Sequence, residues 1–309
     1  MLTLSNVKKS FGAHEVIKGV SFQVEKGESF GLLGPNGAGK STLISMICGL
    51  VPSESGEILV AGKQVGKNLK DIKQIIGVVP QDIALYPTMS ALDNLVFWGK
   101  MYGLSGKVAK ARAKEVLEIV GLTERAKGRI DTFSGGMKRR INIGAALMHR
   151  PQLLIMDEPT VGIDPQSRNH ILETVKSLNG QGMTVIYTSH YMEEVEYLCR
   201  RIAIIDEGKL IVSGTKRDLS NRLAGGTVLK LTVDSLRPSF IESLKRLDGV
   251  ERVIVRHEEI DVHLQSKMEI VADVILLAGR SEVAIHNLKL QEANLETLFL
   301  QLTGRSLRE

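Results

Sequence analysis

A glycine-rich segment near the N-terminus has the residue types and the spacing that bind phosphate. Gly34-Pro35-Asn36-Gly37-Ala38-Gly39-Lys40-Ser41 fits the pattern G-x-x-x-x-G-K-[ST], between an apolar strand and an apolar helix. The glycines let backbone N–H groups curl around phosphate oxygens, and the helix N-terminus adds partial positive charge. Lys40 would reach the β- and γ-phosphates, and Ser41 would offer an oxygen to Mg²⁺. The segment predicts a nucleotide site, which by itself would also suit a kinase or a GTPase.

Two adjacent carboxylates form a second candidate site. The apolar run 153–156 leads directly into Asp157 and Glu158, and neighbouring side chains on a strand point in opposite directions. Phosphoryl transfer depends mainly on positioning and on the neutralisation of charge. We therefore assign Asp157 to Mg²⁺ and Glu158 to polarising the water that attacks the γ-phosphate.

A serine and two glycines form a third candidate site. Phe133-Ser134-Gly135-Gly136-Met137 precedes a helix that is rich in lysine and arginine. Ser134 can cap this helix, and the glycines expose its N-terminal N–H groups. The segment therefore predicts a second anion site.

Over residues 1–219 the sequence resembles the nucleotide-binding subunit of an ATP-binding cassette (ABC) transporter, whose signature is usually Leu-Ser-Gly-Gly-Gln. Ser134 lies 23 positions before Asp157, as the family layout implies. In that family, the signature of one subunit closes over the γ-phosphate bound to another. The resemblance therefore implies a homodimer that encloses two ATP molecules.

The resemblance also implies roles for four further residues. Gln81 resembles the glutamine that senses Mg²⁺ and connects to the membrane subunit, and His190 resembles the histidine that contacts the γ-phosphate. Asp164 occupies the position of the aspartate that crosses the dimer interface, and Phe11 that of the tyrosine that stacks on adenine. The expected catalytic residues are Lys40, Gln81, Glu158 and His190. The expected Mg²⁺ ligands are Ser41, Gln81 and Asp157. The residues expected to contact ATP are Phe11, Gly34, Pro35, Asn36, Gly37, Ala38, Gly39, Lys40, Ser41, Thr42, Ser134, Gly135, Gly136 and Asp164.

The departures from the family pattern remove no charged or metal-binding group. Phe133 and Met137 alter the signature, Phe11 replaces the tyrosine, and residues 161–163 replace small residues before Asp164. Met137 lacks the amide of the usual glutamine, so we expect altered turnover with binding retained.

The elements that must position these residues follow from the apolar patterns. Strands are expected at 2–7, 19–24, 29–33, 57–60 and 75–79, and helices at 40–50 and 109–120. Continuous apolar strands at 153–156, 184–188 and 202–206 indicate a parallel sheet covered on both faces. The predicted fold is an α/β P-loop NTPase cassette over residues 1–219, with a mixed sheet and a helical subdomain at about 82–150.

A different pattern begins after residue 219, beyond a hinge at 224–226. Strands at 228–233, 250–256, 259–264 and 283–288 are interleaved with helices at 240–247 and 270–278, and a closing helix is expected at 295–302. This is the split order of a ferredoxin-like sandwich. Residues 220–309 are therefore predicted to form a small α+β accessory domain.

Composition and charge narrow the location and the partners. The 309 residues contain no apolar run of about 20, the length that spans a bilayer, and no signal peptide. Cys48 and Cys199 show no metal-ligand spacing and are expected to be buried thiols. The net charge of +5 is concentrated in residues 100–150, where twelve basic residues face four acidic ones, a balance of 12 − 4 = +8. We expect a protein at the cytoplasmic face of a prokaryotic cell membrane, with this segment near lipid head groups.

The signature, the C-terminal domain and the ending 295–304 resemble ATPases that are paired with ABC-2 type permeases, including antibiotic and multidrug exporters. A helical groove at 82–99 is expected to receive a cytoplasmic helix of the permease. An ABC importer ATPase is one alternative, although the predicted α+β tail differs from a regulatory β-barrel. A cassette ATPase that acts on nucleic acid is the other, although only 94 positions separate Lys40 from Ser134, and a coiled-coil insertion would be far longer. We expect no nucleic-acid partner, and the transported substrate is set by the permease.

Overall fold

A computed structural model describes residues 1–189, 191–221, 227–256, 259–264, 270–292 and 299. The described residues fall into two compact units, one up to Thr215 and one that begins at Lys216. The predicted boundary after residue 219 lies within helix α8 (Lys216–Asn221), and it stays a prediction. In the described part of the chain, no helix combines the length and the apolar character needed to cross a bilayer.

The first unit contains two sheets. An antiparallel sheet has the order β2-β1-β4-β5, from β1 (Leu2–Phe11), β2 (His14–Val24), β4 (Ser55–Val60) and β5 (Lys63–Gln64). A six-stranded sheet has the order β10-β9-β3-β8-β7-β6, from β3 (Ser29–Leu33), β6 (Ile76–Val79), β7 (Leu153–Asp157), β8 (Thr184–Thr188), β9 (Arg201–Asp206) and β10 (Lys209–Thr215). Only β10 runs antiparallel to its neighbour in this second sheet, which makes it the predicted mixed sheet.

One face of the six-stranded sheet packs against the antiparallel sheet and α1 (Lys40–Ile47). Phe30 and Leu32 of β3 point into this core, where the Phe30 ring stacks on Phe22 with centroids 5.3 Å apart. On the opposite face of β3, Gly31 lies against α7 (Met192–Leu198), since a Cβ there would lie 2.5 Å from Val195 Cγ1. The expectation of a sheet covered on both faces is met at this strand.

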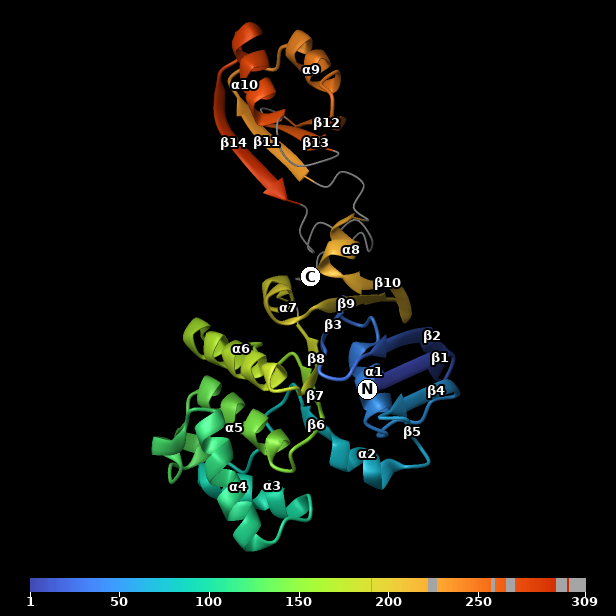
Figure 1. Cartoon of the computed structure of the whole chain (residues 1–309), viewed down its shortest axis with the longest axis vertical. Helices are drawn as coiled ribbons and strands as arrows, with labels where there is room; N and C mark the ends of the chain where they lie inside the picture. Colours follow the sequence, from blue (N-terminus) through green and yellow to red (C-terminus); the bar gives the residue numbers. More distant parts are fainter. Residues whose placement is uncertain (190, 222–226, 257–258, 265–269, 293–298, 300–309) are drawn as a thin grey trace. The chain divides into compact units, whose positions relative to one another are not determined.

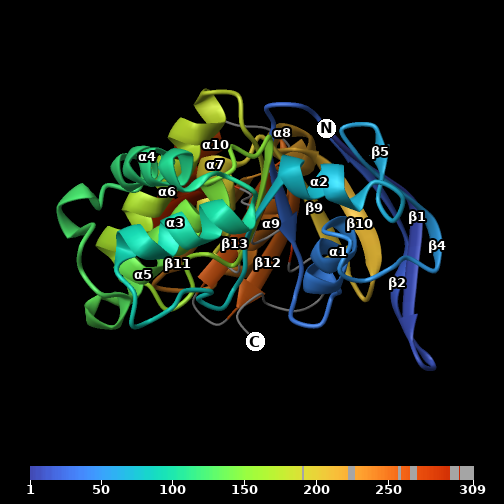
Figure 2. The same cartoon turned by 90° about the horizontal axis from the view of Figure 1, so that it is seen from below.

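A group of helices lies on the side of the unit opposite the antiparallel sheet (Figures 1 and 2). It consists of α3 (Ala91–Met101), α4 (Gly106–Ile119) and α5 (Gly135–Leu147), with two short 3₁₀ helices between α4 and α5. The apolar positions predicted for 109–120 are buried, including Ala113, Val116 and Leu117 of α4. This group corresponds to the helical subdomain predicted at about 82–150.

Several elements differ from the sequence expectation. The first helix ends at Ile47 rather than Leu50, and β2 begins at His14 rather than at residue 19 because it continues as a hairpin with β1. Helices α2 (Leu69–Ile75) and α6 (Pro165–Gly180) and the strands β5 and β10 had not been predicted. The continuous apolar pattern identified buried strands, but it missed elements with an exposed side.

The second unit has a four-stranded antiparallel sheet of order β12-β13-β11-β14. Its elements are β11 (Thr227–Val233), α9 (Pro238–Lys245), β12 (Val250–Arg256), β13 (Glu259–Leu264), α10 (Ile270–Arg280) and β14 (Ile285–Glu292). Phe240 and Leu244 of α9 and Val274 of α10 pack on one face of the sheet. The element order matches the predicted split β-α-β-β-α-β arrangement. The predicted hinge at 224–226 and most of the closing helix at 295–302 lie outside the described residues.

Candidate functional site

The loop between β3 and α1 turns at a glycine that no other residue could replace without strain. Gly39 has φ 100°, in the left-handed region, and a Cβ there would lie 2.7 Å from Ile17 Cδ1. This turn starts α1 at Lys40, so the N-terminus of the helix opens toward the loop 34–39. The backbone N–H groups of the first turn are thereby available to an anion.

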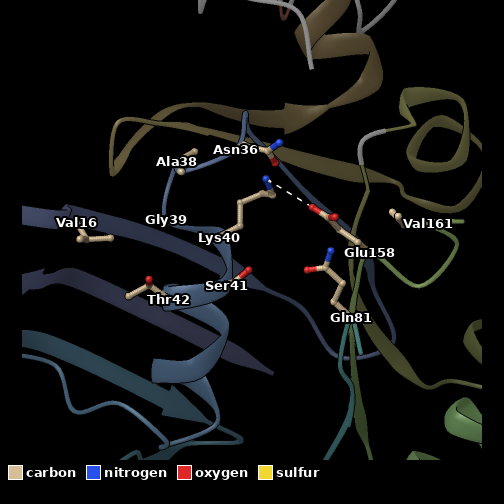
Figure 3. Close-up of a pocket in the computed structure, with 11 residues that line it drawn as sticks. Val16, Asn36, Ala38, Gly39, Lys40, Ser41, Thr42, Gln81, Glu158 and Val161 are labelled. Atoms are coloured by element: carbon tan, nitrogen blue, oxygen red, sulfur yellow. Dashed lines mark ion pairs between the residues drawn. The ribbon is translucent and has the colours of Figure 1, made fainter. Parts of the chain in front are cut away.

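Lys40 is buried and is held over the loop. Its Nζ donates hydrogen bonds to the carbonyl oxygens of Gly34 (2.7 Å) and Pro35 (3.1 Å), and it lies 3.9 Å from Glu158 Oε1 (Figure 3). Burial lowers the pKa of Lys40, while the nearby carboxylates of Glu158 and Asp157 act in the opposite direction. The ammonium is thus fixed beside two acids.

A pocket of about 430 Å³ lies over this loop, and we call its lining residues together with Asp157 the phosphate site. In Figure 3, Gln81 and Glu158 lie across the pocket from Lys40 and Ser41. The structure therefore brings together residues from α1, from the end of β7 and from the loop after β6. The lining residues are Val16, Asn36, Gly37, Ala38, Gly39, Lys40, Ser41, Thr42, Gln81, Glu158 and Val161.

Asp157 is fixed by two hydroxyl groups. Its Oδ2 accepts a hydrogen bond from Ser41 Oγ (3.1 Å), and its Oδ1 accepts one from Thr188 Oγ1 (2.7 Å). The parallel strands β7 and β8 pair Asp157 with Thr188, so both side chains reach the carboxyl edge of the sheet, where open α/β sheets bind ligands. No role was predicted for Thr188, although its position at the end of an apolar strand was a usable signal.

Glu158 has a backbone conformation that is rare for its residue type. Its φ is +48°, in the left-handed region, and the residue is only 7% exposed. The backbone N–H of Glu158 donates to Thr188 Oγ1 (2.9 Å), so one threonine orients both acids. Strained conformations of this kind persist where the surrounding structure enforces them, often at active sites.

Ser134–Gly136 and Asp164, which we call the signature region, lie together at two helix N-termini and do not line the pocket. Ser134 Oγ accepts from Met137 N (3.3 Å) and so caps α5 as expected. Asp164 Oδ1 accepts from the backbone N–H of Ser167 (2.9 Å), which lowers the Asp164 pKa. A Cβ on Gly136 would lie 2.1 Å from Ser167 Oγ and 3.2 Å from Asp164 Oδ2. The two segments therefore touch.

Two predicted residues remain apart from this geometry. Phe11 ends β1 with 53% of its surface exposed, and Lys9 Nζ lies 5.2 Å from its ring centroid, but the ring does not line the pocket. His190 lies outside the described residues. Val16 and Val161 do line the pocket, and neither was predicted to do so because single valines carry no motif.

A buried carboxylate of α7 was also missed. Glu194 Oε2 accepts hydrogen bonds from Thr160 Oγ1 (2.8 Å), Tyr187 OH (2.9 Å) and Ser189 Oγ (2.6 Å), and Glu194 Oε1 lies 3.4 Å from Arg168 Nε. It ties the segment after Glu158 to the end of β8. Its sequence signal, an acid in an exposed-looking Glu-Glu pair, gave no indication of burial.

The oxygen ligands at this site suit a magnesium ion that is held mainly by the nucleotide. Among the described residues, no group of three or more His, Cys, Asp or Glu could hold a metal ion alone. The Ser41 hydroxyl and the Asp157 carboxylate lie 3.1 Å apart, and both are hard oxygen ligands. Mg²⁺ commonly takes only one or two protein carboxylates and completes its shell with phosphates and water.

Comparisons with known proteins agree with this geometry. The sequence model of the ABC transporter family matches residues 17–161. A linearmycin resistance ATP-binding protein from Bacillus subtilis (strain 168) is 61% identical over 311 residues, which cover 100% of both chains. A Nod factor export ATP-binding protein I from Cupriavidus metallidurans is 38% identical over 309 residues, with 100% of this chain and 99% of that protein covered.

Solved structures share the fold of about 70% of the chain. A dimeric ATP-binding cassette in a post-hydrolysis state, bound to ADP and phosphate, is 27% identical with a TM-score of 0.64. The match covers 70% of this chain and 98% of that one. A nucleotide-free cassette from an ABC transporter is 26% identical with a TM-score of 0.66, covering 72% and 95% of the two chains. The chain therefore belongs to the ABC transporter family, and it is an ATP-binding, ATP-hydrolysing member of that family.

Proposed function

We propose that this chain energises an ABC-2 type exporter by hydrolysing ATP as a homodimer. The observation that carries the proposal is the single pocket in which Lys40, Ser41, Gln81 and Glu158 meet. Lys40 neutralises charge on the β- and γ-phosphates, and Glu158 polarises the attacking water from the opposite wall. Catalysis of this kind depends on positioning and electrostatics, and the fixed, buried Lys40–Glu158 pair supplies both.

Magnesium is part of the proposed reaction. Ser41, Asp157 and Gln81 would hold it, and the ion would neutralise charge that develops on the phosphate oxygens. The contribution of this chain is orientation. Thr188 and Ser41 fix the two oxygens of Asp157, so the carboxylate needs no reorganisation when the nucleotide arrives.

A second copy of the chain completes the site in this proposal. The signature region presents the exposed residues Ser134 and Gly135 at the start of α5, yet none of its residues lines the phosphate site. A helix N-terminus without acidic residues in its first turn is suited to an anion that another molecule delivers. The dimeric state of the solved cassette bound to ADP and phosphate supports the same arrangement. We propose that Asp164 and Phe11 contact the partner and the adenine, respectively.

Export is favoured over import by the two relatives that match along the whole chain. One is named for linearmycin resistance and the other for Nod factor export, and both cover the C-terminal unit as well as the cassette. The proposed C-terminal domain, residues 220–309, carries no nucleotide motif, so a structural role such as tightening the dimer suits it. The transported substrate is chosen by the permease, and a drug, a lipid, a polysaccharide or an ion would each fit.

A groove beside the helical subdomain suits the permease. A pocket of about 740 Å³ contains Trp98 of the predicted segment 82–99, and also Leu50, Met101 and Tyr102. Leu50 and Met101 are 72% and 67% exposed, which is unusual for large apolar side chains. We propose that a cytoplasmic helix of the permease covers them, which would place the chain at the cytoplasmic face of the membrane.

Part of the positive charge of the basic segment 100–150 belongs to arginines that make contacts within the fold. All six of its arginines contact other groups of the chain through ion pairs, hydrogen bonds to carbonyl oxygens or a ring. Lys107, Lys110 and Lys114 of α4 are exposed at a spacing that places them on one helix face. We propose that this smaller basic face lies toward anionic lipid head groups, with nucleic acid as the less favoured alternative.

The catalytic proposal is tested by Glu158→Gln. The amide keeps the shape of the side chain but cannot polarise water as a carboxylate does, so kcat should fall about 10²- to 10³-fold. ATP binding should persist, and dimers should accumulate in size-exclusion chromatography with ATP and Mg²⁺. Glu118→Gln, an exposed change on α4, is the control and should hydrolyse ATP like the wild type. Undiminished turnover in Glu158→Gln would refute the assignment of this residue.

A further inference from the structure

The loop that carries Gln81 is hydrogen-bonded to the helical subdomain at several of its residues. This loop, residues 80–86, leaves the six-stranded sheet at the end of β6 and leads toward α3. Ala84 N donates to Asn142 Oδ1 (3.1 Å), and Trp98 Nε1 donates to Ala84 O (3.2 Å). Asn94 Oδ1 accepts from Tyr86 N (2.8 Å), and Asn94 Nδ2 donates to Tyr86 O (3.0 Å). An exposed loop is thus fixed by side chains of α3 and α5.

The start of the loop is held by a buried arginine. Arg139 Nη1 donates to Pro80 O (2.7 Å), and Arg139 Nη2 donates to Gln81 O (2.5 Å). The residue is 4% exposed, and burial lowers the pKa of its guanidinium, while Asp82 acts in the opposite direction. Burying a cation is costly unless its hydrogen bonds have a good geometry. The planar fork of an arginine fixes two consecutive carbonyls in a way that a neutral side chain does not.

The position of Arg139 connects the two regions that the proposed function requires. The carbonyl that it holds belongs to Gln81, whose side chain lines the phosphate site (Figure 3). The helix that carries it, α5, begins directly after Ser134 in the signature region. A displacement of α5 would therefore act on the peptide of Gln81 through the two hydrogen bonds of Arg139.

We infer that Arg139 is a positioning residue that couples the signature helix to Gln81 in the phosphate site of the same chain. The inference rests on the proposed function, since it gives Gln81 a role in Mg²⁺-dependent hydrolysis. It predicts that loss of the guanidinium fork slows turnover with little effect on ATP affinity, because Arg139 itself does not line the pocket.

The neighbouring arginine provides a matched control. Arg140 Nε donates to Val120 O (2.7 Å), and Arg140 Nη2 donates to Gly121 O (2.6 Å). It makes the same kind of contact from the same helix, two bonds to consecutive carbonyls, but at the end of α4 rather than at the Gln81 loop. A purely structural effect of losing an arginine from α5 should therefore appear in both variants.

The chain also contains its own reporter of the loop. Trp98 is the only tryptophan in the sequence, and its ring nitrogen donates to Ala84 O within the loop. Its fluorescence should respond when the loop moves, and it requires no label.

The experiment compares Arg139→Gln, Arg139→Lys and Arg140→Gln in the full-length chain. We expect Arg139→Gln to lower kcat about 10- to 100-fold, because small misplacements of a catalytic group have effects of that size. The ATP dissociation constant should stay within about 2-fold, the Mg²⁺ concentration for half-maximal activity should rise, and the ATP-induced change in Trp98 emission should shrink. Arg139→Lys, which keeps a charged donor, should recover part of each effect. Arg140→Gln should lower the unfolding midpoint but leave kcat within about 2-fold of the wild type and the Trp98 response intact.

Two outcomes would overturn the inference. One is an equal loss of kcat in Arg139→Gln and Arg140→Gln with unchanged Trp98 emission, which would make both arginines merely structural. The other is wild-type turnover in Arg139→Gln. If Arg139→Gln does not fold, full activity and a full Trp98 response in Arg139→Lys would equally exclude a requirement for the guanidinium fork. A wild-type chain that hydrolyses no ATP would instead refute the proposed function, so the two failures are distinguishable.

Discussion

The phosphate site and the signature region both place glycines at a helix N-terminus, but they differ in charge and in burial. In the phosphate site, buried Lys40 lies 3.9 Å from buried Glu158, and a threonine fixes both acids. In the signature region, Ser134 and Asp164 are exposed and cap their own helices. The first region therefore holds the groups that neutralise charge and activate water, whereas the second contains no cation and consists of N–H groups, a hydroxyl and the carboxylate of Asp164. This division is what a site shared between two copies requires.

Removing the charge of Lys40 should weaken the binding of ATP to the phosphate site. Lys40→Ala deletes a charged donor that is fixed by two carbonyls, and such bonds contribute about 1.5 to 3 kcal/mol, so ATP affinity should fall about 10- to 150-fold. Calorimetric titration of ATP into the purified variant measures this loss. Lys110→Ala, an exposed change on α4, should bind like the wild type. Unchanged affinity in Lys40→Ala would place the triphosphate elsewhere.

Crowding the signature region should affect turnover rather than nucleotide binding. In Gly136→Ala the new Cβ would lie 2.1 Å from Ser167 Oγ and 2.3 Å from Ser167 Cβ, so α5 and α6 must shift apart. We expect kcat to fall about 10- to 100-fold through misplacement of the signature, while ATP still binds to the separate chain. Ser167→Gly removes the obstructing atoms and keeps the backbone N–H that Asp164 accepts, so the double variant should recover activity. Failure of this rescue, or loss of ATP affinity in Gly136→Ala, would contradict the separation of the two regions.

Most residues of the phosphate site were predictable from the sequence, because the residue types and the spacing within each motif indicate a chemical role. The glycine loop and the two acids at the end of β7 came from local patterns, and Gln81 came from the resemblance to the ABC family; the structure places all of them in the phosphate site. Thr188, Val16 and Glu194 were missed for a common reason: their contacts depend on which strands and helices become neighbours. Strand pairing between β7 and β8 puts Thr188 beside Asp157, and no local pattern contains that information.

The fold was predictable where one pattern dominates. Strands buried on both faces read as continuous apolar runs, so β3, β7 and β8 were found with bounds close to those observed. Strand β10 and helices α2 and α6 mix exposed and buried positions, and they were not found.

The net charge of the segment 100–150 overstated the charge that this segment presents on the surface. Arg139 and Arg140 donate to backbone carbonyls inside the fold, and a count of charges cannot show this.

Loss of the Thr188 hydroxyl should reduce activity less than the changes at Lys40 and Gly136. Thr188→Val keeps the shape but removes the donor to Asp157 Oδ1 and the acceptor of Glu158 N. Leaving a buried donor unsatisfied costs about 1 to 3 kcal/mol of stability, and a loosened Asp157 should raise the Mg²⁺ requirement and lower kcat about 10-fold. Activity measured across a Mg²⁺ titration separates these effects. Thr188→Ser retains the hydroxyl and should behave nearly like the wild type; if serine and valine are equally impaired, the methyl group rather than the hydroxyl matters.

Helix α1 begins at Lys40 of the phosphate site, and the buried thiol of Cys48 directly follows its C-terminal end. Burial, with a smaller contribution from Asp157, raises the pKa of Cys48 to about 12, whereas a thiol in an unfolded chain ionises near about 8.5. Between these values the unfolded chain loses a proton that the folded chain keeps, so this group makes stability fall as the pH rises above about 8.5. Urea unfolding at pH 8, 9 and 10 should show a decline that Cys48→Ala reduces by on the order of 1 to 2 kcal/mol at pH 10. Ser45→Ala, on the same helix, should keep the wild-type slope, and parallel curves for Cys48→Ala and the wild type would show that this thiol is not the titrating group.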